Sequence, residues 1–110
     1  MINSIELRFN NFVKYEGEIK QIKSMWDFDY IDDFYPIPLT KELLLTCGFV
    51  WVDSFKCYVH GYKTEKEFIL KQYSDFWLMC DIDLKVVVKY LHQLQNLYFA
   101  LTNNELKIIL

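Results

Sequence analysis

Residues 90–102 have the sequence YLHQLQNLYFALT, and the spacing of apolar side chains in this stretch decides the fold class. Leu91, Leu94, Tyr98 and Leu101 recur at intervals of three and four, as on one face of an α-helix, while polar residues collect on the opposite side. The pattern predicts an amphipathic helix of about three turns that starts near Lys89.

The polar residues of this helix fall into two groups. By helical angle Gln95 lies near the apolar stripe, and a buried amide must find hydrogen-bond partners. We therefore expect Gln95 to attach the helix to a strand edge or a loop. His92, Gln93 and Asn96 lie on the polar side, where hydrogen bonds to neighbouring loops and a binding face are both open alternatives.

The residues on either side of the helix favour extended structure. Val86–Val88 is a β-branched run that favours an extended approach. Asn103 and Asn104 end the helix, and residues 105–110 then alternate as in a terminal strand. Residues 49–62 and 66–81 are dense in aromatic and β-branched side chains and predict three or four antiparallel strands.

The first half of the chain predicts a hairpin and a short helix. Residues 12–15 and 19–22 contain β-formers on either side of the turn signal Glu16-Gly17. After the extended segment 36–38, Thr40 is a plausible N-cap, residues 41–47 form a two-turn helix, and Gly48 suits the left-handed position that follows. The predicted class is α+β: a small antiparallel sheet packed by one C-terminal amphipathic helix and one short helix.

Length and composition predict one domain, residues 1–110. The chain has 110 residues, 53% of them hydrophobic, and a formal charge of −3. It contains no apolar run of about 20 residues and no signal-peptide pattern at its start. Three widely spaced cysteines suit reduced thiols. We expect a cytoplasmic protein with no membrane segment; the sequence leaves its oligomeric state open.

The stretch 26–35 is the most unusual part of the sequence. It holds four Asp, five aromatic rings and no base. From residue 26 to residue 30 rings alternate with Asp, which predicts a strand with three rings on one face and two carboxylates on the other. Exposed, the stretch would instead form an acidic, aromatic protein interface. The candidate partner-binding residues are Trp26, Asp27, Asp29, Tyr30, Asp32, Asp33, Phe34 and Tyr35.

Patterns for catalysis, metal binding or nucleic-acid binding are weak. Only Cys57 and His60 lie close enough in sequence to suggest zinc ligands, and they have no second pair. Arg8 is the only arginine and the eleven lysines are scattered, which disfavours direct nucleic-acid binding. We therefore predict no catalytic residue, metal or cofactor. A thiol–imidazole enzyme stays a minor alternative, drawing on Cys47, Cys57 or Cys80 with His60 or His92.

Residues 90–102, followed by Glu105-Leu106, resemble a signature of small, mostly uncharacterised proteins encoded by phages and mobile elements of Bacteroidota. The match extends to residues 6–8, 11–13, 15, 17–19, 36–40 and 47–49. Members commonly have a glycine at the positions of Phe9 and Asn103, so we expect the turns there to be built differently. The resemblance supplies no catalytic residues.

The resemblance implies a function by binding. One member of the family is an anti-CRISPR protein that inhibits an RNA-guided, RNA-cleaving type VI effector nuclease. The leading hypothesis is accordingly a non-enzymatic phage or mobile-element protein that binds and inhibits a bacterial defence nuclease, a CRISPR effector with or without its guide RNA. The alternative is a phage accessory or assembly protein that binds another protein or itself through Lys89, Gln93 and Asn96.

Overall fold

The computed structural model describes residues 6–64, 66–80 and 85–110. The chain divides into two compact units, and it passes from one to the other three times. The first unit contains the residues up to Pro38 together with Tyr90–Glu105, and the second contains Leu39–Lys89 together with Leu106–Leu110. Neither unit is a continuous stretch of sequence. The chain is a single domain, as predicted, only if the two units unfold together.

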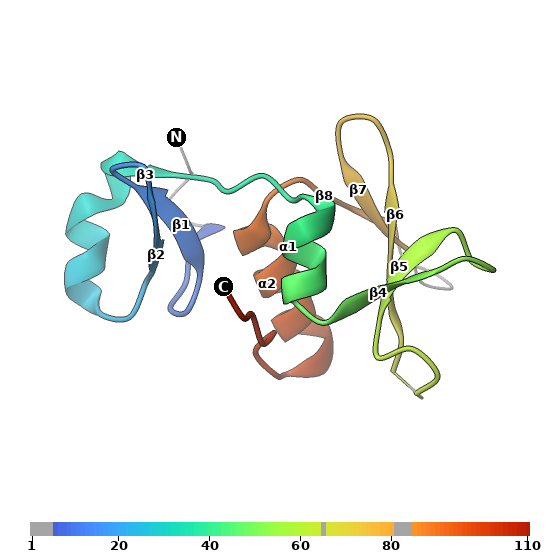
Figure 1. The fold of residues 1–110 in the computed structure, drawn as a ribbon. Helices are drawn as coiled ribbons and strands as arrows, with labels where there is room; N and C mark the ends of the chain where they lie inside the picture. The colour runs from blue at the N-terminus through green and yellow to red at the C-terminus, as the bar shows by residue number, and fades with distance from the viewer. Residues whose placement is uncertain (1–5, 65, 81–84) are drawn as a thin grey trace. The chain divides into compact units, whose positions relative to one another are not determined.

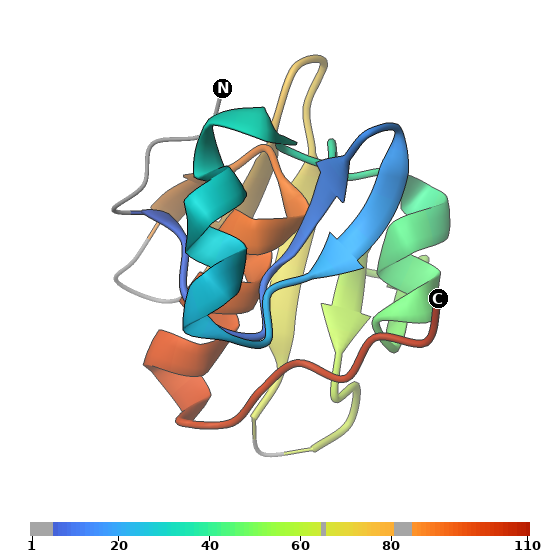
Figure 2. The same cartoon turned by 90° about the vertical axis from the view of Figure 1, so that its left-hand side faces the viewer.

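The first unit holds a three-stranded antiparallel sheet with the order β2-β1-β3 (Figure 1). Strands β1 (Phe12–Tyr15) and β2 (Glu18–Gln21) form the predicted hairpin, and Gly17 in its turn has a φ of +81°, which glycine adopts without strain. The 3-10 helix η2 (Met25–Asp33) follows β2 and leads into the two-residue strand β3 (Phe34–Tyr35). Figure 2 shows η2 in cyan beside the blue strands of the hairpin.

The predicted amphipathic helix is present as α2 (Leu91–Thr102), also in the first unit. Its buried residues are Leu91, His92, Leu94 and Gln95, whereas Leu101, predicted on the apolar stripe, is exposed. Asn103 ends the helix with a φ of 60°, and its N–H donates to the Phe99 carbonyl at 2.8 Å. Asn therefore serves at a left-handed position where the resembled family commonly has glycine.

The second unit holds a five-stranded antiparallel meander in the order β4-β5-β6-β7-β8. The elements preceding and forming it are α1 (Lys41–Thr46), β4 (Phe49–Val52), β5 (Cys57–His60), β6 (Phe68–Gln72), β7 (Trp77–Cys80) and β8 (Lys85–Val88). Residues 49–81 were predicted to hold three or four strands and contain four, β4 to β7, and the predicted extended run before α2 is β8. Thr40 caps α1 as expected, because its hydroxyl accepts from Leu43 N–H at 3.1 Å.

The predicted terminal strand over residues 105–110 is wrong. These residues do not form a strand. The Ile109 N–H donates a single hydrogen bond to the carbonyl of Thr46 in α1, at 3.0 Å. Leu106 is buried while Ile109 and Leu110 are exposed. Alternation of apolar residues shows which side faces a core, but a strand also needs backbone pairing with a neighbouring strand, which this segment does not form.

The α+β class is confirmed, with antiparallel strands, one C-terminal helix and one short helix. The strands lie in two sheets, a division that the hydrophobic pattern did not reveal. Among the described residues no helix combines the length and apolar character needed to cross a bilayer. The core of the first unit is formed by Leu7, Val13, Ile22 and Phe34, with Tyr15, Phe28 and Ile31 packed against it.

Candidate functional site

The acidic, aromatic stretch forms the 3-10 helix η2 and not the predicted strand. The reason is a second periodicity in the same residues: Phe28, Ile31 and Phe34 are apolar at every third position, which matches the three residues per turn of a 3-10 helix. These three side chains pack on the core of the first unit. The alternation of rings with Asp had suggested a period of two, but burial follows the period of three.

Asp27, a predicted partner-binding residue, uses its carboxylate inside the chain. Its Oδ2 accepts from the backbone N–H groups of Lys23 at 2.8 Å and Ser24 at 3.1 Å, which fixes the start of η2. Its Oδ1 lies 3.1 Å from the ammonium of Lys20. The Lys23 N–H and the Lys20 ammonium hold the pKa of Asp27 below its usual value. We therefore remove Asp27 from the candidate binding surface.

Phe34 and Tyr35 must also be removed from that surface. Phe34 is fully buried in the core and has no surface to offer a partner. Tyr35 is exposed, but as the next residue of β3 it points to the opposite face of the sheet. Because η2 packs on the Phe34 face, the sheet separates Tyr35 from the exposed side of η2.

The remaining candidates all lie on η2, whose helical backbone is interrupted by a kink at Tyr30 (φ −105°, ψ 15°). Trp26 and Met25 are 77% and 78% exposed, and Tyr30 is half-exposed with its ring 5.6 Å from that of Tyr15. Asp29, Asp32 and Asp33 are exposed, and their carboxylates make no hydrogen bond or ion pair with any described residue. Sequence reasoning did not single out Met25. We call these six residues the η2 surface: Met25, Trp26, Asp29, Tyr30, Asp32 and Asp33.

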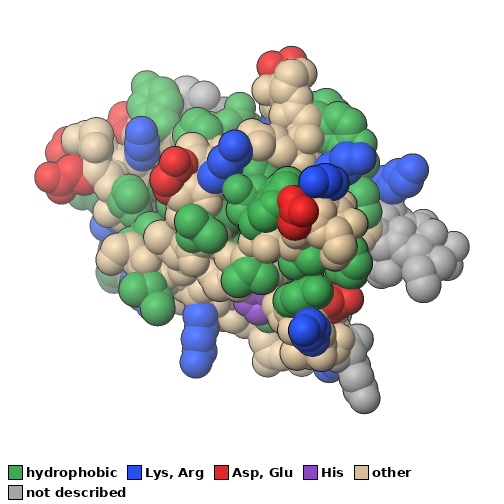
Figure 3. Space-filling view, turned by 45° about the vertical axis from the view of Figure 1, so that its right-hand side comes forward, with side chains coloured by type: hydrophobic (Ala, Val, Ile, Leu, Met, Phe, Trp, Pro, Cys, Tyr) green, Lys and Arg blue, Asp and Glu red, His purple; other side chains and the backbone are tan. Residues whose placement is uncertain are grey.

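The charge around the η2 surface is more negative than that of the chain as a whole. The first unit contains four basic and eight acidic side chains, a formal charge of −4, against −3 for all 110 residues. Two of its four bases are already paired, Lys20 with Asp27 and Arg8 with Glu105. Acidic side chains gather at the left edge of Figure 3, on the side of the view where η2 lies in Figure 1. The surface is therefore suited to a basic partner.

The polar side of α2 is committed to contacts within the first unit. As predicted, the buried Gln95 amide pins the helix to the start of β1: its Oε1 accepts from Phe12 N–H and its Nε2 donates to the Asn10 carbonyl, both at 2.8 Å. Asn96 donates to the Glu6 carbonyl at 2.6 Å and accepts from Asn11 at 2.9 Å.

Two further polar residues of α2 face the carboxylate of Glu6. Gln93 Nε2 donates to Glu6 Oε1 at 3.2 Å, and His92 Nε2 lies 3.4 Å from the same oxygen. With the contacts of Asn96, these bonds favour the alternative in which the polar side serves neighbouring segments. Because the side chains of Gln93 and Asn96 already form these hydrogen bonds, they have fewer polar atoms left for self-association.

Two of the three candidate thiols, Cys47 and Cys57, are buried. Burial raises the pKa of Cys47 to about 11 and also raises the pKa of Cys57, so both are protonated at neutral pH. Burial lowers the pKa of His60. Within the described residues, no three His, Cys, Asp or Glu side chains gather in a way that could hold a metal ion.

In comparisons with known proteins, no family model matches this chain, and neither a curated protein nor a solved structure is similar to it. The family resemblance of residues 90–102 therefore stays a prediction. The chemistry of the η2 surface is the remaining guide to function.

Proposed function

We propose that this protein is not an enzyme and acts by binding a basic surface of another protein through the η2 surface. The observation that carries the proposal is the exposure of Trp26 on the same element as three carboxylates that pair with no described residue. An exposed tryptophan among polar side chains is an anchor of the kind that dominates protein interfaces. The carboxylates supply the charge that guides a basic partner to it.

The two kinds of side chain have separate energetic roles. Burying the exposed part of the Trp26 ring contributes about 2–4 kcal/mol, from the area of an indole and the free energy per unit of apolar surface. Exposed carboxylates contribute less to affinity, because solvent and salt screen them, but they raise the association rate. We therefore expect truncation of Trp26 to change mainly the dissociation rate.

The partner that we propose is a CRISPR effector nuclease of type VI, with or without its guide RNA, in the cytoplasm of a bacterial host. The family resemblance suggests this class, and the acidic η2 surface supports it, because RNA-guided effectors hold nucleic acid in positively charged channels. A formal charge of −3 is too small for mimicry of a nucleic acid by the whole protein. Any mimicry must be local, and the η2 surface is where it fits.

The test uses a purified type VI effector nuclease, alone and loaded with guide RNA, and the intact chain. We expect the chain to bind and to reduce RNA cleavage in proportion to occupancy. D32K/D33K should weaken binding at least tenfold at low salt and flatten its salt dependence. The control E16K/E18K changes the net charge equally at exposed positions of the β1–β2 hairpin and should bind like the wild type.

Three results would contradict the proposal. The first is no binding to either form of the effector, combined with recovery of no basic protein by the tagged chain from a host with an intact defence locus. The second is an equal loss of affinity in D32K/D33K and E16K/E18K. The third is a self-associated state by light scattering that substitutions at Lys89 and Asn96 abolish and D32K/D33K does not, which would favour the accessory-protein alternative.

A further inference from the structure

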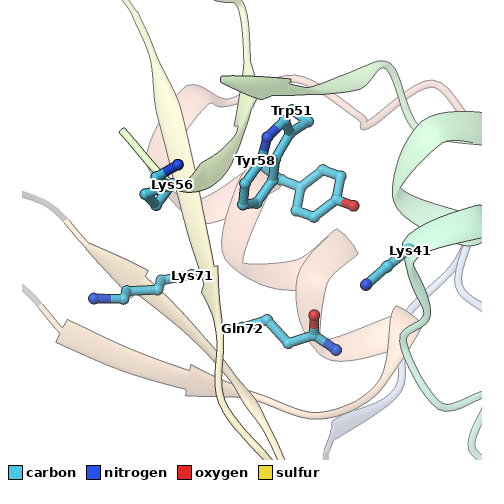
Figure 4. Close-up of a pocket in the computed structure, with 6 residues that line it drawn as sticks. All are labelled: Lys41, Trp51, Lys56, Tyr58, Lys71 and Gln72. Atoms are coloured by element: carbon cyan, nitrogen blue, oxygen red, sulfur yellow. The ribbon is translucent and has the colours of Figure 1, made fainter. Parts of the chain in front are cut away.

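The second unit contains an open hollow with a volume of about 430 Å³, and none of its lining residues belongs to the η2 surface. Figure 4 shows the side chains around it. None of the described residues that line the hollow is acidic. Its lining residues are Lys41, Trp51, Lys56, Tyr58, Lys71 and Gln72.

The fold gathers residues that are scattered in the sequence. Trp51 of β4 is the register partner of Tyr58 of β5, so the two rings share one face of the sheet. Gln72 ends β6, and Lys41 begins α1. In Figure 4 the Lys41 and Gln72 side chains extend toward the open space beside the Tyr58 ring. Counting lysines along the chain could not reveal this cluster.

The Tyr58 ring of the hollow is held by contacts with two neighbouring indole rings. The Tyr58 ring lies 5.1 Å from Trp51 and 5.7 Å from the buried Trp77, at steep angles to both. Trp51 is 49% exposed, so part of its indole remains open to a ligand. A ring held by edge-to-face contacts loses little conformational freedom when another planar group stacks on it.

The ammonium groups of the three lysines around the hollow make few strong interactions with other described residues. The Lys41 ammonium makes no hydrogen bond or ion pair with any described residue. Lys56 pairs with Asp53 at 3.1 Å, but both side chains are more than 70% exposed and solvent screens the pair. The Lys71 ammonium lies 5.8 Å from the centre of the Tyr73 ring, and in Figure 4 it points away from the rings. Lys41 is therefore the best-placed cation.

We propose that this hollow binds a nucleotide. In this arrangement Lys41 attracts the phosphate, Trp51 stacks on the base, and the Gln72 amide, with both a donor and an acceptor, bonds the base edge. The volume lies within the range of small-ligand sites. The nucleotide is either free or one residue of a single-stranded RNA. This site is independent of the η2 surface, and it differs from the expectation that the protein does not contact nucleic acid.

The experiment uses the intact chain with three probes: uridine monophosphate, a ten-residue oligouridylate and inorganic phosphate, each at low salt. We expect both uridine probes to quench tryptophan fluorescence. Trp51→Leu should remove most of the quenching, and Lys41→Ala should weaken binding at least fivefold. The control Lys14→Ala removes one exposed lysine of β1 and should bind like the wild type, with circular dichroism confirming that all variants are folded.

The probes also separate the two sources of the nucleotide. Tighter binding of the oligouridylate than of the monophosphate, with affinity that falls steeply with salt, assigns the site to RNA. Equal binding of the two assigns it to a free nucleotide, and both results support the proposal. Phosphate that competes as well as the monophosphate would overturn it, as would Lys41→Ala binding no worse than Lys14→Ala. An oligoglutamate that binds tighter than either uridine probe would overturn it too.

Discussion

Arg8 and Glu105 are 97 positions apart in the sequence and form a two-point ion pair. Arg8 Nη1 lies 2.6 Å from Glu105 Oε2, and Nη2 lies 3.0 Å from Oε1. The guanidinium also donates to the Gln95 carbonyl at 3.2 Å and lies 4.5 Å from the centre of the Phe99 ring. The only arginine of the chain therefore links the N-terminal segment of the first unit to α2 and to the residues after α2.

Loss of this pair should destabilise the protein in a pH-dependent way. The Arg8 guanidinium lowers the pKa of Glu105, so its contribution is present above about pH 4.5 and is lost as the pH falls below that value. We expect E105Q to reduce the free energy of unfolding by about 1 kcal/mol at pH 7, a value discounted for solvent exposure. Urea unfolding at pH 7 and pH 3 measures this. An equal difference at both pH values would show that the pair is not ionic.

The Gln95 amide should be among the most sensitive polar groups. Gln95→Leu keeps the volume of the side chain but leaves the Phe12 N–H without its acceptor, which we expect to reduce the free energy of unfolding by about 2 kcal/mol. The matched control is the exposed amide of Gln72. Gln72→Leu should change the free energy of unfolding by less than about 0.5 kcal/mol. Equal effects in chemical denaturation would mean that Gln95 does not pin α2 to β1.

His92 should make the protein less stable in weak acid. It is 1% exposed, and burial lowers its pKa below the ordinary 6.5, although Glu6 raises it in part. The unfolded chain therefore binds a proton before the folded chain does, so this stability is complete above about pH 6.5 and falls as the pH drops below it. We expect His92→Gln to reduce the slope of unfolding free energy against pH between 7.5 and 5.5. An unchanged slope would assign the effect to other groups.

The two units should unfold in one transition. The chain crosses between them three times, so neither can form from a continuous stretch of sequence. We expect circular dichroism and tryptophan fluorescence to give the same urea midpoint, and the calorimetric and van't Hoff enthalpies to agree. Two separate midpoints would contradict the prediction of a single domain.

Local chemistry made much of the fold predictable. Thr40 and Gly48 mark the ends of α1, Glu16-Gly17 marks the hairpin turn, and the spacing of Leu91 and Leu94 marks α2. The predicted strand at residues 105–110 failed because strand pairing depends on an edge elsewhere in the chain. The division into two sheets is equally non-local.

The candidate site was predictable only in part. Trp26, Asp29, Tyr30, Asp32 and Asp33 lie on the exposed helix as an interface requires, but Asp27 and Phe34 serve the fold. The signal that could have separated them was the apolar period of three through Phe28, Ile31 and Phe34. The alternation of rings with Asp obscured this period. The lysines around Trp51 come together only through strand register, which composition does not show.

The most direct test of the account compares two exposed rings that the sequence placed in one group. Trp26 lies on the η2 surface, whereas Tyr35 lies on the other face of the sheet. For binding to the type VI effector, measured by surface plasmon resonance, we predict that Trp26→Ala raises the dissociation constant at least tenfold and that Tyr35→Ala leaves it unchanged. Equal constants for the two variants, whether both raised or both unchanged, would contradict the claim that the protein acts through the η2 surface.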